Sequence, residues 1–272
     1  MVMKYDFQDI PAVVLAGGPK VAFDANQPAQ KKALLRFAGK SSIQYVLDAL
    51  RGVAQIRRIG IVGLDGQALR EVRGASRCDS IPAAGDSMIE HVYSAMRYFA
   101  ADPAILFVTA DAPLVSSESV VDFIEQVSLK NRTHGPNIFI AVVPVDCYRG
   151  IYRQVTKAFL RFKDIAVRHG NLAVVDTRLG GDQILKKKLE ILYKNRKSAM
   201  RSIASLSLRA GLLFLLDGLL GRVMSMEAMA RRISNSLGIG LHPVVVAHPG
   251  IAVDADEPED YLFLKRALET KV

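Results

Sequence analysis

The stretch PAVVLAGG, which runs from Pro11 to Gly18, decides the fold of this protein. An apolar run that ends in two glycines is typical of a strand buried on both faces that feeds a tight loop. Paired glycines also let the backbone approach a phosphate or a base and present amide donors to it. A tight strand-to-helix turn without any ligand is the alternative that this stretch alone leaves open.

Apolar strands alternate with amphipathic helices outward from this stretch. Strands are predicted at Arg57–Gly63, Ala104–Ala110 and Asn137–Val145, with helices at Asp86–Ala101 and Ser117–Leu129. Such alternation indicates βαβ units with right-handed crossovers and a parallel sheet. We therefore expect an α/β fold with a doubly wound, mostly parallel sheet, whose ligands bind beyond the carboxyl ends of the strands.

The pattern changes after Thr156, where a turn is predicted at His169-Gly170 and a long helical region at residues 181–237. The helical region has the character of an insertion near the C-terminus, so residues 1–272 are interpreted as a single domain that contains it. The remaining predicted elements are extended segments at Ala33–Phe37, Ala158–Phe162, Asn171–Thr177 and Pro243–His248, a helix from Ser41 or Ser42, and a terminal helix at Glu257–Glu269.

The positive charge of the chain is concentrated in one segment. The net charge is +9, and residues 186–232 carry 11 Lys and Arg against three acids. A nucleic-acid-binding protein that was basic throughout would look different, so no nucleic-acid partner is expected. Three interpretations of the segment stay open: helices that pack together and expose a basic face, peripheral contact with an anionic membrane, and a homodimer interface.

Several classes of protein and site are excluded by missing patterns. Two cysteines, Cys78 and Cys147, are too few for a disulfide scaffold or a four-cysteine zinc site. The sequence has no HExxH, GxGxxG or GxxxxGK[ST] motif, which argues against histidine zinc, Rossmann dinucleotide and P-loop sites. With no apolar signal core in MVMKYDFQDI and no run of 18 uncharged apolar residues, we expect a cytoplasmic protein.

Acids and a lysine provide the candidate chemistry. Asp111 follows a buried strand in VTADAPLV, where a carboxylate can hold Mg²⁺ or an Asx turn can form before Pro113. Asp254 and Asp256 precede the terminal helix and could face a metal, whereas later acids would complement the helix dipole. Lys32 follows the glycine loop and can return to it as a positive charge for a phosphate.

Taken together, LAGG, KALLRFAGKSSIQYVLDAL, TADAPLV and VDADEPEDYLFLKRAL resemble the nucleotidyltransferase fold family. That family includes molybdenum-cofactor guanylyltransferases, sugar-phosphate nucleotidyltransferases and methylerythritol-phosphate cytidylyltransferases. The elements occur in family order over about 12–145 and 243–268. The resemblance implies a nucleotide-diphospho-sugar transferase-like fold, Mg²⁺ or Mn²⁺ as cofactor, and an NTP with a phosphorylated acceptor as partners.

The resemblance also implies roles for particular residues. Lys32 would contact phosphate and act in catalysis with Asp111, and Asn171 would contact the acceptor. Asp111 and Asp256 would ligate the metal. The residues that would bind the nucleotide are Leu15, Ala16, Gly17, Gly18, Lys32, Gly85 and Ser87.

One departure from the family pattern concerns the glycine loop. The family loop commonly carries an arginine, whereas here no arginine occurs between Gly18 and Arg36, and Lys20 or Lys31 would have to substitute. The sequence thus predicts a Mg²⁺-dependent nucleotidyltransferase that moves a nucleoside monophosphate from an NTP to a phosphorylated acceptor with release of pyrophosphate. The alternative is a nucleotide-binding or regulatory module of the same fold with reduced catalysis; the base and the acceptor are left open.

Overall fold

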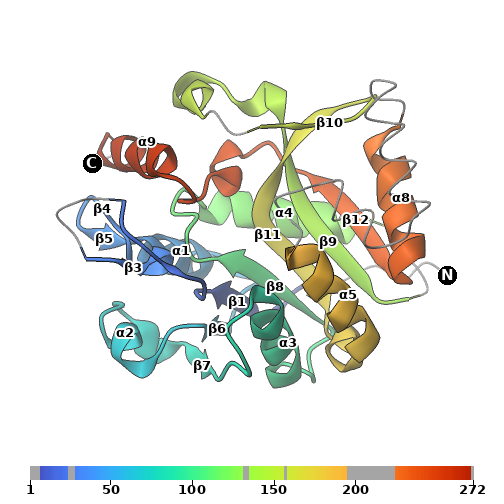
Figure 1. The fold of residues 1–272 in the computed structure, drawn as a ribbon, viewed down its shortest axis with the longest axis horizontal. Helices are drawn as coiled ribbons and strands as arrows, with labels where there is room; N and C mark the ends of the chain where they lie inside the picture. The colour runs from blue at the N-terminus through green and yellow to red at the C-terminus, as the bar shows by residue number, and fades with distance from the viewer. Residues whose placement is uncertain (1–6, 24–27, 131–134, 156–157, 195–223, 271–272) are drawn as a thin grey trace.

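A mixed eight-stranded sheet forms the centre of the protein in the computed structural model (Figure 1). The structure describes residues 7–23, 28–130, 135–155, 158–194 and 224–270. The strand order is β12-β9-β11-β8-β1-β6-β7, with β10 paired to β11. The strands are β1 Ala12–Leu15, β6 Ile59–Val62, β7 Asp79–Ile81, β8 Ala104–Thr109, β9 Asn137–Pro144, β10 Leu160–Arg161, β11 Ala166–Asp176 and β12 Gly240–Val245.

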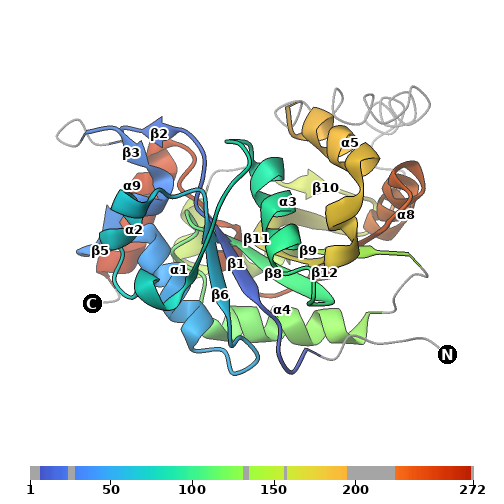
Figure 2. The same ribbon diagram turned by 90° about the horizontal axis from the view of Figure 1, so that it is seen from below.

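Helices cover both faces of the sheet (Figure 2). On one face Val14 and Leu106 pack with α1 and α4, and on the other Val13 and Ile105 pack with α3 and α5. Successive strand residues therefore enter two different cores, which confirms the doubly wound prediction. The helices are α1 Ser42–Arg51, α2 Gly66–Arg70, α3 Met88–Tyr98, α4 Ser117–Leu129, α5 Gln183–Lys194, α8 Met226–Leu237 and α9 Pro258–Glu269.

The sheet is mostly parallel, as predicted, with β11 antiparallel to both β8 and β9. The predicted turn at His169-Gly170 is wrong, because β11 runs through it with a register shift between His169 and Ala173. A Cβ on Gly170 would lie 2.9 Å from the Cβ of Ala141 on β9. The glycine marks a close approach of two strands, which a sequence pattern cannot distinguish from a turn.

Other boundaries also differ from the predictions. Residues Lys32–Leu34 form a 3₁₀ helix, so only Arg36–Phe37 of the predicted extended segment Ala33–Phe37 is a strand, labelled β4. The strand predicted at Pro243–His248 is β12, which begins earlier at Gly240 and pairs with β9. The short strand β7 and helix α2 were not predicted; both are too brief to show a clear period.

Within the predicted helical insertion 181–237, the described residues form two helices, α5 and α8. The apolar stretch Ala210–Gly221 and most of the basic segment 186–232 lie outside those residues. Lys186, at the start of the basic segment, is not a solvated charge: its Nζ lies 2.5 Å from Glu90 Oε1 and 5.9 Å from the ring centre of Tyr93. Within the described part of the chain, no helix is long and apolar enough to cross a membrane.

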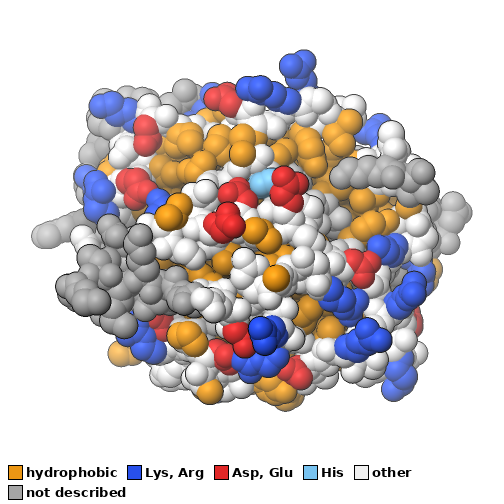
Figure 3. All heavy atoms as spheres, turned by 180° about the vertical axis from the view of Figure 1, so that it is seen from behind, with side chains coloured by type: hydrophobic (Ala, Val, Ile, Leu, Met, Phe, Trp, Pro, Cys, Tyr) orange, Lys and Arg blue, Asp and Glu red, His pale blue; other side chains and the backbone are white. Residues whose placement is uncertain are grey.

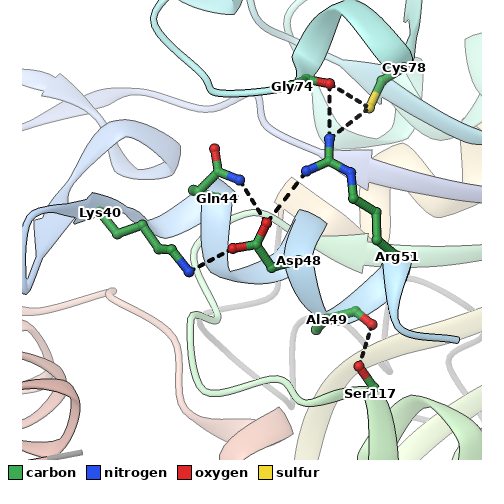
Figure 4. A network of polar contacts seen from close by, with 8 residues as sticks. All are labelled: Lys40, Gln44, Asp48, Ala49, Arg51, Gly74, Cys78 and Ser117. Carbon is green, nitrogen blue, oxygen red and sulfur yellow. Dashed lines mark hydrogen bonds and ion pairs between the residues drawn. The ribbon is translucent and has the colours of Figure 1, made fainter. Parts of the chain in front are cut away.

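Helix α1 is tied to its neighbours by polar contacts (Figure 4). Asp48 accepts hydrogen bonds from Lys40, Gln44 and Arg51. Ser117 Oγ, at the start of α4, donates to the carbonyl of Ala49 on α1 at 2.7 Å, and this bond joins the two helices. The face opposite to the view of Figure 1 shows acidic and apolar side chains among its Lys and Arg side chains (Figure 3).

Candidate active site

The candidate site lies at β1, where the order in which the chain adds strands to the sheet reverses direction. The chain continues from β1 to β6 and β7 on one side, and then places β8 on the other side of β1. The Ala16 amide donates to Val62 O at 2.8 Å and the Ala110 amide to Leu15 O at 3.0 Å, so the β1 loop is held from both sides. In open α/β sheets, ligands bind at such a switch point, beyond the carboxyl ends of the strands.

Gly17 and Gly18 emerge from β1 at this point. Gly18 has φ +104°, a backbone conformation that L side chains rarely adopt, so the loop requires a glycine there. Leu15 and Ala16 lead into the loop, with Leu15 half-buried and Ala16 buried. These four predicted nucleotide-binding residues therefore share one loop at the switch point.

Three carboxylates from distant parts of the sequence meet beside this loop. Asp111 follows β8, and Asp254 and Asp256 lie between the 3₁₀ helix Pro249–Ala252 and α9. One carboxylate oxygen of each lies within 4.8 Å of one oxygen of both others. The Ala255 amide donates to the carbonyl of Asp111 at 3.0 Å, which holds the two acidic segments together.

Lys32 lies among these carboxylates. Its Nζ forms an ion pair with Asp256 Oδ1 and lies 3.9 Å from Asp111 Oδ2. The Lys32 and Asp111 side chains are each 19% exposed, whereas that of Asp256 is 50% exposed. The structure thus brings Lys32 together with Asp111, Asp254 and Asp256, all of which the sequence analysis had named as candidate residues.

Burial raises the pKa of the Asp111 carboxyl above its ordinary value. The neighbouring Asp256 carboxylate acts in the same direction, and the Lys32 ammonium opposes it. The folded protein therefore holds the Asp111 negative charge at an energetic cost. A site that gathers negative charge in this way is typical of a place where a cation is needed.

The residues fit a hard divalent cation. Carboxylate oxygens are the donors that Mg²⁺ and Mn²⁺ prefer, and such ions are held by one or two carboxylates together with substrate phosphates. Asp111, Asp254 and Asp256 supply three candidate oxygens within reach of one another. The donor set is therefore appropriate for Mg²⁺ or Mn²⁺.

Two other predicted nucleotide-binding residues lie at the start of α3. The exposed Ser87 is the N-cap of this helix, and its hydroxyl accepts a hydrogen bond from the Glu90 amide at 3.1 Å. The backbone of Gly85 lies next to the His91 ring and acts to raise the pKa of His91, although burial lowers it overall. His91 is buried and was not singled out by the sequence analysis, because a lone histidine shows no metal-ligand spacing.

Asn171, the predicted acceptor contact, lies on the β11 segment that extends past the paired part of β8. Its Nδ2 donates to the carbonyl of Ile251 at 3.1 Å. Ile251 belongs to the 3₁₀ helix that precedes Asp254 and Asp256. Asn171 is therefore connected by this hydrogen bond to the segment that leads to Asp254 and Asp256.

A doubly wound sheet with glycines, a lysine and clustered carboxylates at its switch point is typical of α/β enzymes that bind a ligand there. Residues 12–212 match the model of the MobA-like NTP transferase domain. The chain belongs to that family and is accordingly a nucleotidyltransferase-type enzyme. No curated protein matches the chain.

Solved structures share the fold. A hypothetical transferase from Thermus thermophilus has TM-score 0.75 at 22% identity, covering 93% of this chain and 99% of its own. A CMP:2-keto-3-deoxy-manno-octonic acid synthetase complexed with CTP has TM-score 0.59 at 11% identity, with coverage of 97% and 100%. A 2-C-methyl-D-erythritol 4-phosphate cytidylyltransferase, also from Thermus thermophilus, has TM-score 0.53 at 14% identity, with coverage of 96% and 99%.

Proposed function

We propose that the protein is a Mg²⁺- or Mn²⁺-dependent nucleotidyltransferase that transfers a nucleoside monophosphate from an NTP to a phosphorylated small-molecule acceptor. The observation that carries the proposal is the meeting of Lys32, Asp111 and Asp256 beside the Gly17-Gly18 loop. Family membership supports the transfer of a nucleotide, and the CTP-bound neighbour makes CTP the first triphosphate to test.

In the proposed reaction, an acceptor phosphate oxygen attacks the α-phosphorus of the NTP. A new phosphorus–oxygen bond forms, and the bond to the bridging oxygen of the β-phosphate breaks, so that pyrophosphate leaves with the electron pair. A phosphate acceptor is already anionic at neutral pH, so no side chain has to remove a proton from it. The work of the protein is to position two anions and to offset their charge.

Lys32 would place its ammonium against the phosphates, and Asp111, Asp254 and Asp256 would hold the divalent cation. A bound divalent cation supplies positive charge to the triphosphate and to the leaving pyrophosphate. Gly17, Gly18, Gly85 and Ser87 would bind the nucleotide, and Asn171 would contact the acceptor or orient the segment that carries Asp254 and Asp256.

A nucleotide-binding or regulatory module with reduced catalysis is the second candidate. It is favoured by the missing loop arginine and by Lys31, whose Nζ donates to Gly63 O at 2.7 Å instead of facing the site as a free cation. Lys20, exposed in the loop and paired in register with Lys31, is the better substitute for that arginine. Membrane contact or dimerisation through residues 186–232 is proposed only as an additional property of that segment.

A thermal-shift screen of ATP, GTP, CTP and UTP with and without Mg²⁺ tests the function. A ligand at 100 times its Kd stabilises the folded state by about 2.7 kcal/mol. The expected result is a metal-dependent rise in Tm with at least one triphosphate. The absence of any shift would contradict the proposal, and binding without pyrophosphate release across phosphorylated acceptors would favour the second candidate.

A further inference from the structure

His91 occupies the point where three loops of the nucleotide site come together. It is 4% exposed and lies in α3, where its amide donates to Ser87 O at 3.1 Å. The ring is packed beneath the switch-point loops, with Gly17 after β1 and Gly63 after β6 as neighbours. It does not belong to the carboxylate cluster.

The close packing of the His91 ring against Gly17 and Gly63 is shown by the atoms that a Cβ on either glycine would contact. A Cβ on Gly17 would lie 1.9 Å from His91 Cε1 and 2.4 Å from Nδ1, and all three of its nearest atoms belong to His91. A Cβ on Gly63 would lie 2.9 Å from His91 Cε1 and 2.4 Å from the Gly17 nitrogen. The imidazole therefore fills the space against the backbone of both loops.

The third loop, which precedes α3, also lies next to the His91 ring, because the Gly85 backbone acts on the pKa of His91. Burial lowers the pKa of His91, and Lys31, whose Nζ bonds to Gly63 O, acts in the same direction. The Gly85 backbone and the carboxylates of Asp86 and Glu90 act in the opposite direction. The ring is thus neutral at physiological pH and offers one donor and one acceptor nitrogen.

The backbone conformation of Gly17 does not by itself require a glycine. Its φ lies outside the left-handed region, unlike those of Gly18 and Gly63. The space it leaves is taken by the His91 ring, so the absence of a side chain at Gly17 is explained by that ring before any nucleotide is considered.

We propose that His91 is a positioning residue of the nucleotide site, whose ring joins the loops at Gly17, Gly63 and Gly85 into one preorganised surface for the NTP. This role rests on the proposed function. Preorganisation lowers the cost of ordering loops on binding, so the residue acts on affinity for the NTP. The reacting groups Lys32 and Asp111 are held by other contacts.

The test compares His91→Ala with the wild-type protein and with His242→Ala. His242 is a matched control, because burial also lowers its pKa but it bonds to Asn137 on the β9–β12 side of the sheet. His91→Ala is expected to raise the Kd for the best triphosphate with Mg²⁺ about tenfold, with kcat changed far less than KM. His91→Gln keeps a polar side chain that can fill the space beside Gly17 and Gly85, and it is expected to restore most of the affinity. His242→Ala is expected to lower Tm without changing Kd.

A second readout needs no nucleotide. Amide hydrogen exchange in segments 16–18, 63–65 and 84–86 is expected to be faster in His91→Ala than in His242→Ala. Unchanged exchange in the three segments, or a Kd equal to that of the wild-type protein, would overturn the role of His91. Failure of the wild-type protein to bind any NTP would instead overturn the proposed function, and the exchange experiment would still decide whether His91 holds the loops.

A double-mutant cycle between Gly17 and His91 provides a further check of the contact between them. Gly17→Ala alone is expected to lower Tm, because its new Cβ meets the imidazole. In Gly17→Ala combined with His91→Ala, that clash is absent and much of the loss is expected to be recovered. Strictly additive losses in this double-mutant cycle would show that the two residues are not coupled, and would contradict the proposal.

Discussion

The backbone amide of Ala255 donates a hydrogen bond to the carbonyl oxygen of Asp111 at 3.0 Å. Ala255 lies between Asp254 and Asp256, so this bond places both acids near the Asp111 carboxylate, which follows β8. The central sheet and the C-terminal segment each contribute part of the candidate site. Substitutions on both sides of this bond should therefore affect the same metal-dependent step.

Asp111→Asn and Asp256→Asn are each expected to abolish metal-dependent transfer, because an amide does not provide the charge that holds a hard cation. For Asp111→Asn, the Tm at pH 7.5 is expected to equal or exceed that of the wild-type protein. Its pKa is raised by burial, so ionised Asp111 costs stability that the neutral amide does not. Differential scanning calorimetry and a pyrophosphate-release assay measure the two effects.

Asp122→Asn is the matched control for that experiment, since Asp122, which lies on α4, pairs with His248 and is outside the cluster. It is expected to keep its activity. Full activity in Asp111→Asn would remove this residue from the metal site.

Asp254→Asn is expected to shift the metal requirement more than the maximal rate. A ligand set reduced from three carboxylates to two should raise the Mg²⁺ concentration for half-maximal activity, on the order of tenfold. Glu259→Gln removes an exposed acid from the first turn of α9 and serves as the control. Identical Mg²⁺ titrations for the two variants would assign Asp254 a structural role only.

Lys32→Ala is expected to lower kcat/KM by about 100-fold, because it removes the cation that would face the phosphates. Lys32→Arg should recover only part of the activity, since a guanidinium differs from an ammonium in shape and reach. Lys40→Ala, which removes an exposed ion pair with Asp48, is the control. Steady-state kinetics of the three variants check the role, and a rate for Lys32→Ala close to that of Lys40→Ala would contradict it.

Asn171→Ala removes the hydrogen bond to Ile251 O and is expected to lower the free energy of unfolding by about 1 kcal/mol. If Asn171 also contacts the acceptor, as proposed, the KM for the acceptor should rise while the KM for the NTP stays the same. Urea unfolding and kinetics with varied acceptor separate the two effects. An unchanged acceptor KM would leave Asn171 with its structural bond alone.

Stability is expected to fall as the pH is lowered from about 7.5 to 5. Burial lowers the pKa values of His91, His169 and His242 in the folded protein. The unfolded chain then binds more protons below its histidine pKa of about 6.5, so folding loses free energy there until the folded-state pKa is passed. His242→Gln should reduce this fall in Tm, although Glu227 and Lys130 near His242 act in opposite directions. An identical pH profile in the variant would contradict the assignment.

Much of the fold could be predicted from local patterns. The apolar run before Gly17-Gly18 is buried as β1, and the periodic residues of α3 and α4 form the predicted helices. Period and burial are properties of neighbouring residues, so a sequence reveals them. Gly170 was wrongly assigned to a turn because the reason for its small size is Ala141, on a neighbouring strand.

The candidate site divides in the same way. The sequence by itself determined which residue types follow the strands and precede the terminal helix, and therefore singled out Lys32, Asp111, Asp254 and Asp256. Only the tertiary structure decided that the three carboxylates meet within 4.8 Å of one another, that Lys31 is bound to Gly63 O, and that the His91 ring packs against Gly17. These relationships depend on distances between residues far apart in the chain, and such distances are set by the packing of the sheet and its helices rather than by any local pattern.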